Sequence, residues 1–104
     1  MVIFGRDLMT IQMPHSLQEK IADLPHRPGV YMMKDARSEV IYVGKAKDLR
    51  LRVRSYWQEG RRERRLISER IGQVEDVAVV VTASEKEAFL LESNLIQQMR
   101  PKYN

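Results

Sequence analysis

The chain has 104 residues, the length of one domain, and 43% of them are apolar, with a mean hydropathy of −0.44. It holds 18 Lys and Arg against 14 Asp and Glu, a net charge of +4. The absence of cysteine excludes disulfides and thiolate metal sites, and two histidines without ligand spacing argue against a zinc enzyme. No apolar run approaches the ~20 residues of a membrane span, so we expect a cytoplasmic domain without membrane contact.

The first 34 residues contain an irregular segment, one helix and one strand. Residues 1–14 show neither periodicity nor a signal-peptide design, and we expect a leader there, followed by a single domain over 15–104. Apolar residues at helical spacing predict a helix over 17–24, with Ser16 as its N-cap. An apolar run predicts a strand over 29–34.

A second strand is predicted over 39–44, joined to the first by a four-residue loop. This loop length places Lys34 opposite Glu39 and Tyr31 opposite Tyr42, so that both tyrosines share one face of the hairpin. Without further evidence, two neighbouring tyrosines are best explained as a cross-strand core pair.

The remaining elements follow the same periodicities. Helices are predicted over 46–57 and 61–74, and a Val-rich run predicts a strand over 77–83 that is buried on both faces. A capping box at 84–87 predicts a last helix, which extends to about Met99.

The positive charge is concentrated in residues 45–65. Nine basic residues there stand against three acidic ones, which gives the segment +6 and leaves −2 for the rest of the chain. Such a patch is typical of a polyanion-binding surface, and a solvated helix surface explains it as well. The members that we expect to contact the DNA backbone are Lys47, Arg50, Arg54, Arg61, Arg62, Arg64 and Arg65.

Lys45 and Lys47 lie at the expected start of the 46–57 helix, where the helix dipole favours negative charge and not positive charge. A preceding glycine, Gly44, and free backbone N–H groups would suit a bound phosphate. On this helix Lys45, Leu49, Arg52 and Tyr56 would share one face, with Lys45 and Arg52 directed towards the site. Surface lysines without a role are the alternative.

Glu92 lies within the apolar stripe of the last helix, which is formed by Ala88, Leu91, Leu95 and Met99. A buried carboxylate is costly unless it is paired or binds a metal. A Mg²⁺ site fits a single carboxylate, because Mg²⁺ needs few protein ligands. The alternatives are an ion pair with an arginine, or a tilt that brings the side chain to the rim.

These residues suit phosphodiester hydrolysis, and the sequence offers no serine or histidine triad. Hydrolysis of a phosphodiester needs charge neutralisation and an activated water. A tyrosine is a poor base at its ordinary pKa of ~10, but nearby cations lower that pKa. A tyrosine beside Lys45 is therefore a credible proton acceptor.

The segments 28–31 and 41–45, which read PGVY and IYVGK, resemble the signature of GIY-YIG nucleases. The longer segments 40–56, 87–96 and 100–104 are similar to the N-terminal domain of the UvrC excinuclease subunit. Val30 and Val43 stand where the family has isoleucine, which leaves the chemistry unchanged.

This resemblance implies an α/β fold of the α+β type, with a small three-stranded antiparallel sheet flanked by helices. It implies a DNA endonuclease that uses one Mg²⁺ or Mn²⁺ ion and makes the 3′ incision in nucleotide excision repair. The implied catalytic residues are Tyr42 as base with Tyr31 as its partner, Lys45 beside the base, Arg52 at the scissile phosphate, Tyr56 and Asn104; Glu92 would bind the metal.

The resemblance also implies partners and alternatives. The family's complete protein meets a UvrB–DNA complex through regions beyond this domain, and we expect the chain to be a monomer that ends at the domain boundary. A nucleic-acid binding module with a vestigial site, and a structure-specific or mobile-element GIY-YIG nuclease, are the competing hypotheses.

Overall fold

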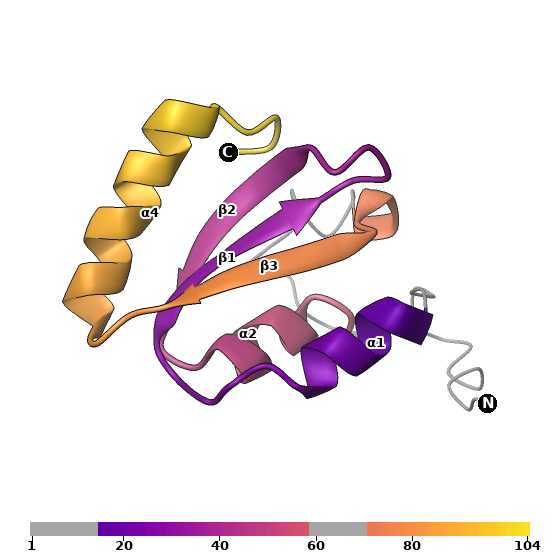
Figure 1. Cartoon of the computed structure of the whole chain (residues 1–104), viewed down its shortest axis with the longest axis horizontal. Coiled ribbons are helices and arrows are strands. Elements are labelled where there is room, and N and C mark those ends of the chain that lie inside the picture. The colour runs from indigo at the N-terminus through magenta and orange to yellow at the C-terminus, as the bar shows by residue number, and fades with distance from the viewer. Residues whose placement is uncertain (1–14, 59–70) are drawn as a thin grey trace.

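The computed structural model describes residues 15–58 and 71–104 (Figure 1). The expected leader, most of the helix predicted over 61–74, and the four arginines Arg61, Arg62, Arg64 and Arg65 lie outside these residues. The elements in chain order are α1 (His15–Ala22), β1 (Gly29–Lys34), β2 (Val40–Ala46), α2 (Leu49–Ser55), the 3₁₀ helix η2 (Ile71–Gln73), β3 (Asp76–Val81) and α4 (Glu85–Met99).

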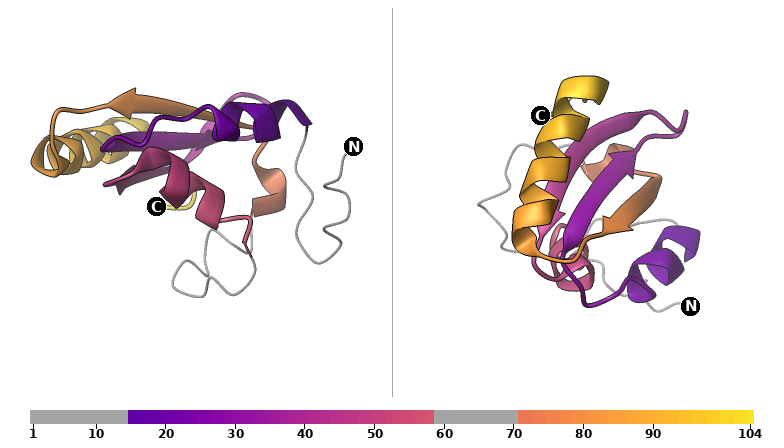
Figure 2. Two further views of the ribbon diagram at one scale, coloured as in Figure 1. Left: turned by 90° about the horizontal axis from the view of Figure 1, so that it is seen from below. Right: turned by 60° about the vertical axis from the view of Figure 1, so that its left-hand side comes forward.

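The three strands form one antiparallel sheet in the order β2-β1-β3, which confirms the predicted fold class. Helices α1 and α2 contribute to the core on one face of the sheet, and α4 packs against β1 and β2 on the other (Figure 2). Among the described residues, no helix combines the length and the apolar character needed to cross a membrane.

The predicted hairpin register is wrong by two residues. Tyr31 lies opposite Gly44, and Tyr42 lies opposite Met33. The loop is longer than expected because the Asp35 carboxylate accepts backbone N–H groups from Arg37 and Glu39, an Asx-type turn. A shift of two residues preserves the alternation of faces, so the two tyrosines still share one face, as predicted.

An irregularity in the pairing ends the regular part of this hairpin. Lys34 pairs with Val40 and Met33 with Tyr42, so Ile41 is the extra residue of a β-bulge. Ile41 is buried with the α1 and α2 side of the core, whereas Val40 packs towards α4. The bulge therefore brings a large apolar side chain to the face that carries the tyrosines.

Two predicted helix starts are wrong. The helix expected from residue 46 begins at Leu49, because Asp48 is its N-cap and accepts the N–H of Leu51. Lys45 consequently lies in β2 and not on the helix face with Arg52. Ser16 lies inside α1 and does not cap it.

The last helix is predicted well. The Ser84 hydroxyl accepts the N–H of Glu87, and the Glu87 carboxylate accepts the N–H of Ala83, which fixes the start of α4. The helix ends after Met99, where Arg100 adopts a left-handed conformation with φ 47°. Met99 was expected in the apolar stripe, but it is exposed.

The Val-rich strand β3 is not buried on both faces as predicted. Val80 and Val81 are each 41% exposed. The reason is that β3 is an edge strand, and α4 packs over β2 and β1 instead of β3. A run of β-branched residues therefore indicated a strand here, but not its place in the sheet.

Candidate active site at the edge of the sheet

Three tyrosines from three elements meet on the α2 side of the sheet. Tyr31 comes from β1, Tyr42 from β2, and Tyr56 directly follows α2 as its C-cap. Their ring centroids lie 6.0–6.4 Å apart, and the Tyr31 and Tyr56 hydroxyl oxygens are 2.7 Å apart, within hydrogen-bonding distance. The structure therefore brings together the three tyrosines predicted for the site.

Gly44 makes this arrangement possible. It lies directly opposite Tyr31, whose ring and hydroxyl pass over the backbone of β2. A Cβ atom at position 44 would collide with the Tyr31 hydroxyl and ring. The sequence suggested that Gly44 would suit a bound phosphate; in the structure, the missing side chain lets Tyr31 reach Tyr56 across the strand.

The tyrosine hydroxyls are less acidic than expected. Burial, as the largest cause, raises the pKa of Tyr42 to about 12 and raises the pKa values of Tyr31 and Tyr56 above the ordinary value near 10. The positive charge of Arg52 lowers all three pKa values but does not outweigh burial. The cation therefore acts in the expected direction, but burial outweighs it, and the net pKa values in the free protein are raised.

Arg52 connects the tyrosines to the molecular surface. Its hydrogen bond with the Tyr31 hydroxyl lowers the pKa of that tyrosine. Arg52 is exposed and lines an open cavity of about 620 Å³, together with Lys45 and Lys47. The arginine therefore contacts the buried hydroxyls on one side and solvent on the other.

Glu92 belongs to α4, which packs on the other face of the sheet, and its charge acts on Tyr42. Its side chain is half-buried, at the rim position that we left open as an alternative. Its negative charge contributes to the raised pKa of Tyr42, so the two groups are electrostatic neighbours. No cluster of three or more potential metal ligands occurs among the described residues, so a metal at Glu92 would take its other ligands from water and substrate.

Asn104 holds the free edge of β2. Its side-chain amide accepts the N–H of Val43 at 2.8 Å and donates to the Val43 carbonyl at 2.9 Å. The backbone N–H of Tyr103 also donates to the carbonyl of Ile41. The C-terminal segment thus pairs with the edge strand on both sides of Tyr42, and Asn104 holds the backbone there.

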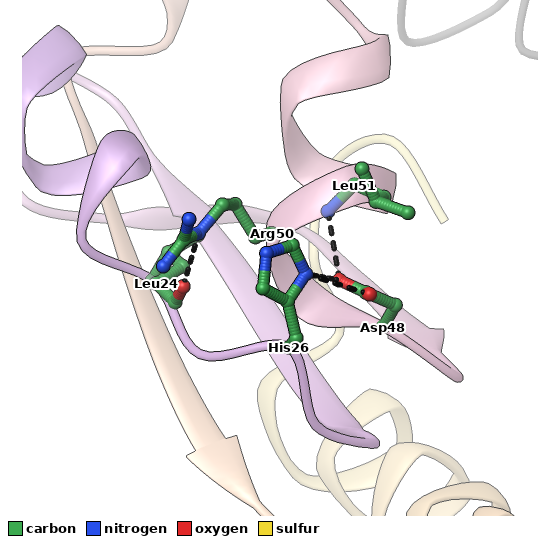
Figure 3. Close-up of polar contacts among 5 residues, drawn as sticks. All are labelled: Leu24, His26, Asp48, Arg50 and Leu51. Carbon is green, nitrogen blue, oxygen red and sulfur yellow. Dashed lines mark hydrogen bonds and ion pairs between the residues drawn. The ribbon is translucent and has the colours of Figure 1, made fainter.

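Arg50, one of the predicted DNA contacts, makes a contact within the domain. Its Nε donates to the Leu24 carbonyl at 2.6 Å, and the side chain is half-buried (Figure 3). Next to it, His26 Nδ1 lies 2.8 Å from the Asp48 carboxylate that caps α2. These contacts fix the start of the helix that carries Arg52, whereas Lys47 and Arg54 are exposed, as a DNA contact requires.

Comparison with known proteins gives a consistent result. A family model described as the UvrC-like GIY-YIG domain matches residues 27–104. UvrABC system protein C from Caldicellulosiruptor saccharolyticus is 53% identical over 91 residues, and that from Anaeromyxobacter dehalogenans is 50% identical over 96 residues. These matches cover 86% and 88% of this chain, which spans only 15% and 13% of the two relatives.

A solved structure is similar over its full length. It is the GIY-YIG N-terminal endonuclease domain of UvrC from Thermotoga maritima, bound to magnesium as its catalytic divalent cation. The TM-score is 0.75 at 42% identity, and the match covers 88% of this chain and 99% of that domain. Variants of that domain with a tyrosine replaced by phenylalanine were also solved with the catalytic cation bound.

Proposed function

Because the chain belongs to the family of UvrC-like GIY-YIG domains, we propose that it is a metal-dependent DNA endonuclease domain. It would hydrolyse one phosphodiester bond, on the 3′ side of a lesion, in nucleotide excision repair. The observation that carries this proposal is the cluster of three tyrosines, joined to the exposed Arg52, with Glu92 close enough for its charge to raise the pKa of Tyr42.

Glu92 is the residue that would hold the divalent ion, Mg²⁺ or Mn²⁺. A half-buried carboxylate at the rim can bind a cation that keeps several water ligands, which is the usual coordination of Mg²⁺. When bound, such an ion neutralises charge on the phosphate and makes a coordinated water more acidic. The negative charge near Tyr42 would at the same time be compensated.

Tyr42 is the residue that would act on the attacking water. Tyr42 shares a hydrogen bond with Tyr56, in which the Tyr42 hydroxyl would be the donor. The Tyr42 oxygen then keeps a lone pair to accept a hydrogen bond from water. With a pKa of about 12, the hydroxyl is protonated at neutral pH, so in the free protein it orients the water and is not a strong base.

Arg52 and Lys45 would stabilise the charge on the phosphate. Both are exposed in the same cavity, and the Arg52 guanidinium is already anchored by Tyr31. An anchored guanidinium stabilises a phosphate transition state well, because little reorganisation is needed. Asn104 acts indirectly, since it holds the backbone next to Tyr42.

Membership of the family supports DNA as the substrate and a UvrB–DNA complex as the partner. DNA would bind along the exposed cations Lys47 and Arg54, and along the arginines between 61 and 65. In the complete protein, regions outside this chain would deliver the domain to a UvrB–DNA complex in the cytoplasm. The domain itself would act as a monomer.

The decisive experiment is a nicking assay on supercoiled plasmid with Mg²⁺ or Mn²⁺. We expect Glu92→Gln to abolish nicking and to remove Mn²⁺ binding measured by electron paramagnetic resonance, while the circular dichroism spectrum is unchanged. Glu75→Gln, which removes an exposed carboxylate outside the site, is the matched control and should nick like the unmodified chain.

Full nicking activity in folded Glu92→Gln would contradict the proposal. Salt-dependent DNA binding by the unmodified chain, with no nicking in either metal, would instead favour a binding module with a vestigial site.

A further inference from the structure

The cavity beside Arg52 extends away from the tyrosines to helix α4. On one side it is lined by residues of β2 and α2, and on the other by the first turns of α4. The residues that matter for its chemistry are Lys45, Lys47, Leu51, Arg52, Lys86 and Phe89. A volume of about 620 Å³ falls in the range of pockets that hold ligands of the size of a nucleotide.

The charge of the lining favours an anion. Four of its residues are cationic, and two, Asp48 and Glu85, are acidic. The Asp48 carboxylate is already engaged, because it caps α2 at Leu51 and lies against His26. The cations therefore outnumber the acids in this cavity.

Phe89 is the unusual member of this lining. Its side chain is 51% exposed, and it belongs to neither of the two apolar clusters that form the core. The adjacent Leu90 is 53% exposed on the same helix but does not line the cavity. An exposed aromatic ring between cations is the arrangement that proteins use to stack a base of a single strand while its phosphates are bound.

We propose that this cavity binds one nucleotide of the DNA strand next to the bond that is cut, with its base stacked on Phe89 and its phosphate held by Lys86. The inference rests on the proposed endonuclease function and adds the path of the strand: from Arg52 at the tyrosines, through the cavity, to the first turns of α4. An apolar protein segment would use Phe89 as well, but it would not use the surrounding cations.

The test compares two probes that differ only in their bases. Fluorescence anisotropy in EDTA gives the Kd of the chain for a dT 12-mer and for a 12-mer with abasic sites throughout. For the unmodified chain we expect the abasic strand to bind about tenfold more weakly, the effect of losing one stacked base. In Phe89→Ala the ratio of the Kd for the abasic strand to the Kd for dT should fall towards one, whereas Leu90→Ala should leave this ratio unchanged.

The remaining variants separate the other outcomes. Lys86→Gln should weaken both probes by a similar factor and reduce the dependence of Kd on salt. Thymidine 5′-monophosphate, used as a competitor, shows whether a free nucleotide is enough for binding. If only unlabelled 12-mer displaces the labelled strand, the cavity binds a DNA strand. If the mononucleotide displaces the labelled strand at a similar concentration, the proposal that the cavity binds a strand is overturned.

The stacking role would be overturned if the ratio of the two Kd values were the same in Phe89→Ala and in the unmodified chain. This includes the case in which the variant binds both probes more weakly by the same factor. Because no metal is present, the measurement is independent of nicking. A Phe89-dependent ratio in a chain that does not nick would leave the stacking site in place and remove only the proposed endonuclease function.

Discussion

The two faces of the sheet differ in how they are packed. The face towards α1 and α2 carries a large cluster with fourteen buried residues, including Trp57 and two of the three site tyrosines. The face towards α4 has three buried residues, Val30, Val43 and Ala88, with partly buried neighbours around them. Among the described residues, one face therefore supplies most of the core, and the other is a thin apolar layer.

The candidate site lies where these two faces meet, at the edge of β2. The tyrosines come from the well-packed face, which fixes their rings, and Glu92 comes from the thin one. An edge strand normally needs protection, and here the C-terminal segment supplies it through Asn104. The well-packed face of this small sheet therefore holds the tyrosine rings in position, whereas the thinly packed face leaves access for a ligand.

The largest expected effect is on stability, and it tests the contrast between the faces. Leu17→Ala, on the well-packed face, should lower the free energy of unfolding by about 3–4 kcal/mol, because a fully buried leucine leaves a cavity. Leu95→Ala, on the α4 face, should cost only about 1 kcal/mol, because that side chain is partly buried. Urea unfolding measures both values, and equal losses would contradict the contrast.

A smaller effect is expected at the crossing of Tyr31 over β2. Gly44→Ala should destabilise the domain by about 1–3 kcal/mol, since the new methyl group collides with Tyr31, and the Tyr31–Tyr56 hydrogen bond should be lost. Gly72→Ala is the matched control, because no atom of residues 15–58 and 71–104 lies within 4 Å of its added Cβ. Nicking should fall in the first variant only; unchanged stability and activity in Gly44→Ala would show that the tyrosines do not need this crossing.

The smallest expected effect is a pH dependence confined to the tyrosine face. The folded state raises the pKa of Tyr42 to about 12, above the value near 10 in the unfolded chain, so the folded state binds this proton more tightly. The resulting stability is fully present below about pH 10 and is lost as the pH rises towards 12. Thermal unfolding between pH 8 and 11 should show this decline, and Tyr42→Phe should reduce its slope; identical slopes would contradict it.

Local patterns predicted most elements, and contacts between distant segments corrected their details. Alternation along two strands placed Tyr31 and Tyr42 on one face, and this holds although the pairing is shifted by two residues. The register itself depends on the Asp35 turn and the bulge at Ile41, which periodicity does not report. The charge pattern likewise did not show that the Arg50 side chain donates to the Leu24 carbonyl.

The sequence by itself determined the three strands, the capped last helix, and the family to which the chain belongs, because short-range periodicity and motifs carry this information. Only the tertiary structure decided that Lys45 belongs to a strand, that Asn104 closes the edge of β2 from 61 positions away, and that Phe89 lines the cavity of Arg52. These facts depend on how α2, α4 and the C-terminal segment pack around one strand edge, and contacts between distant segments leave no periodic trace in the sequence.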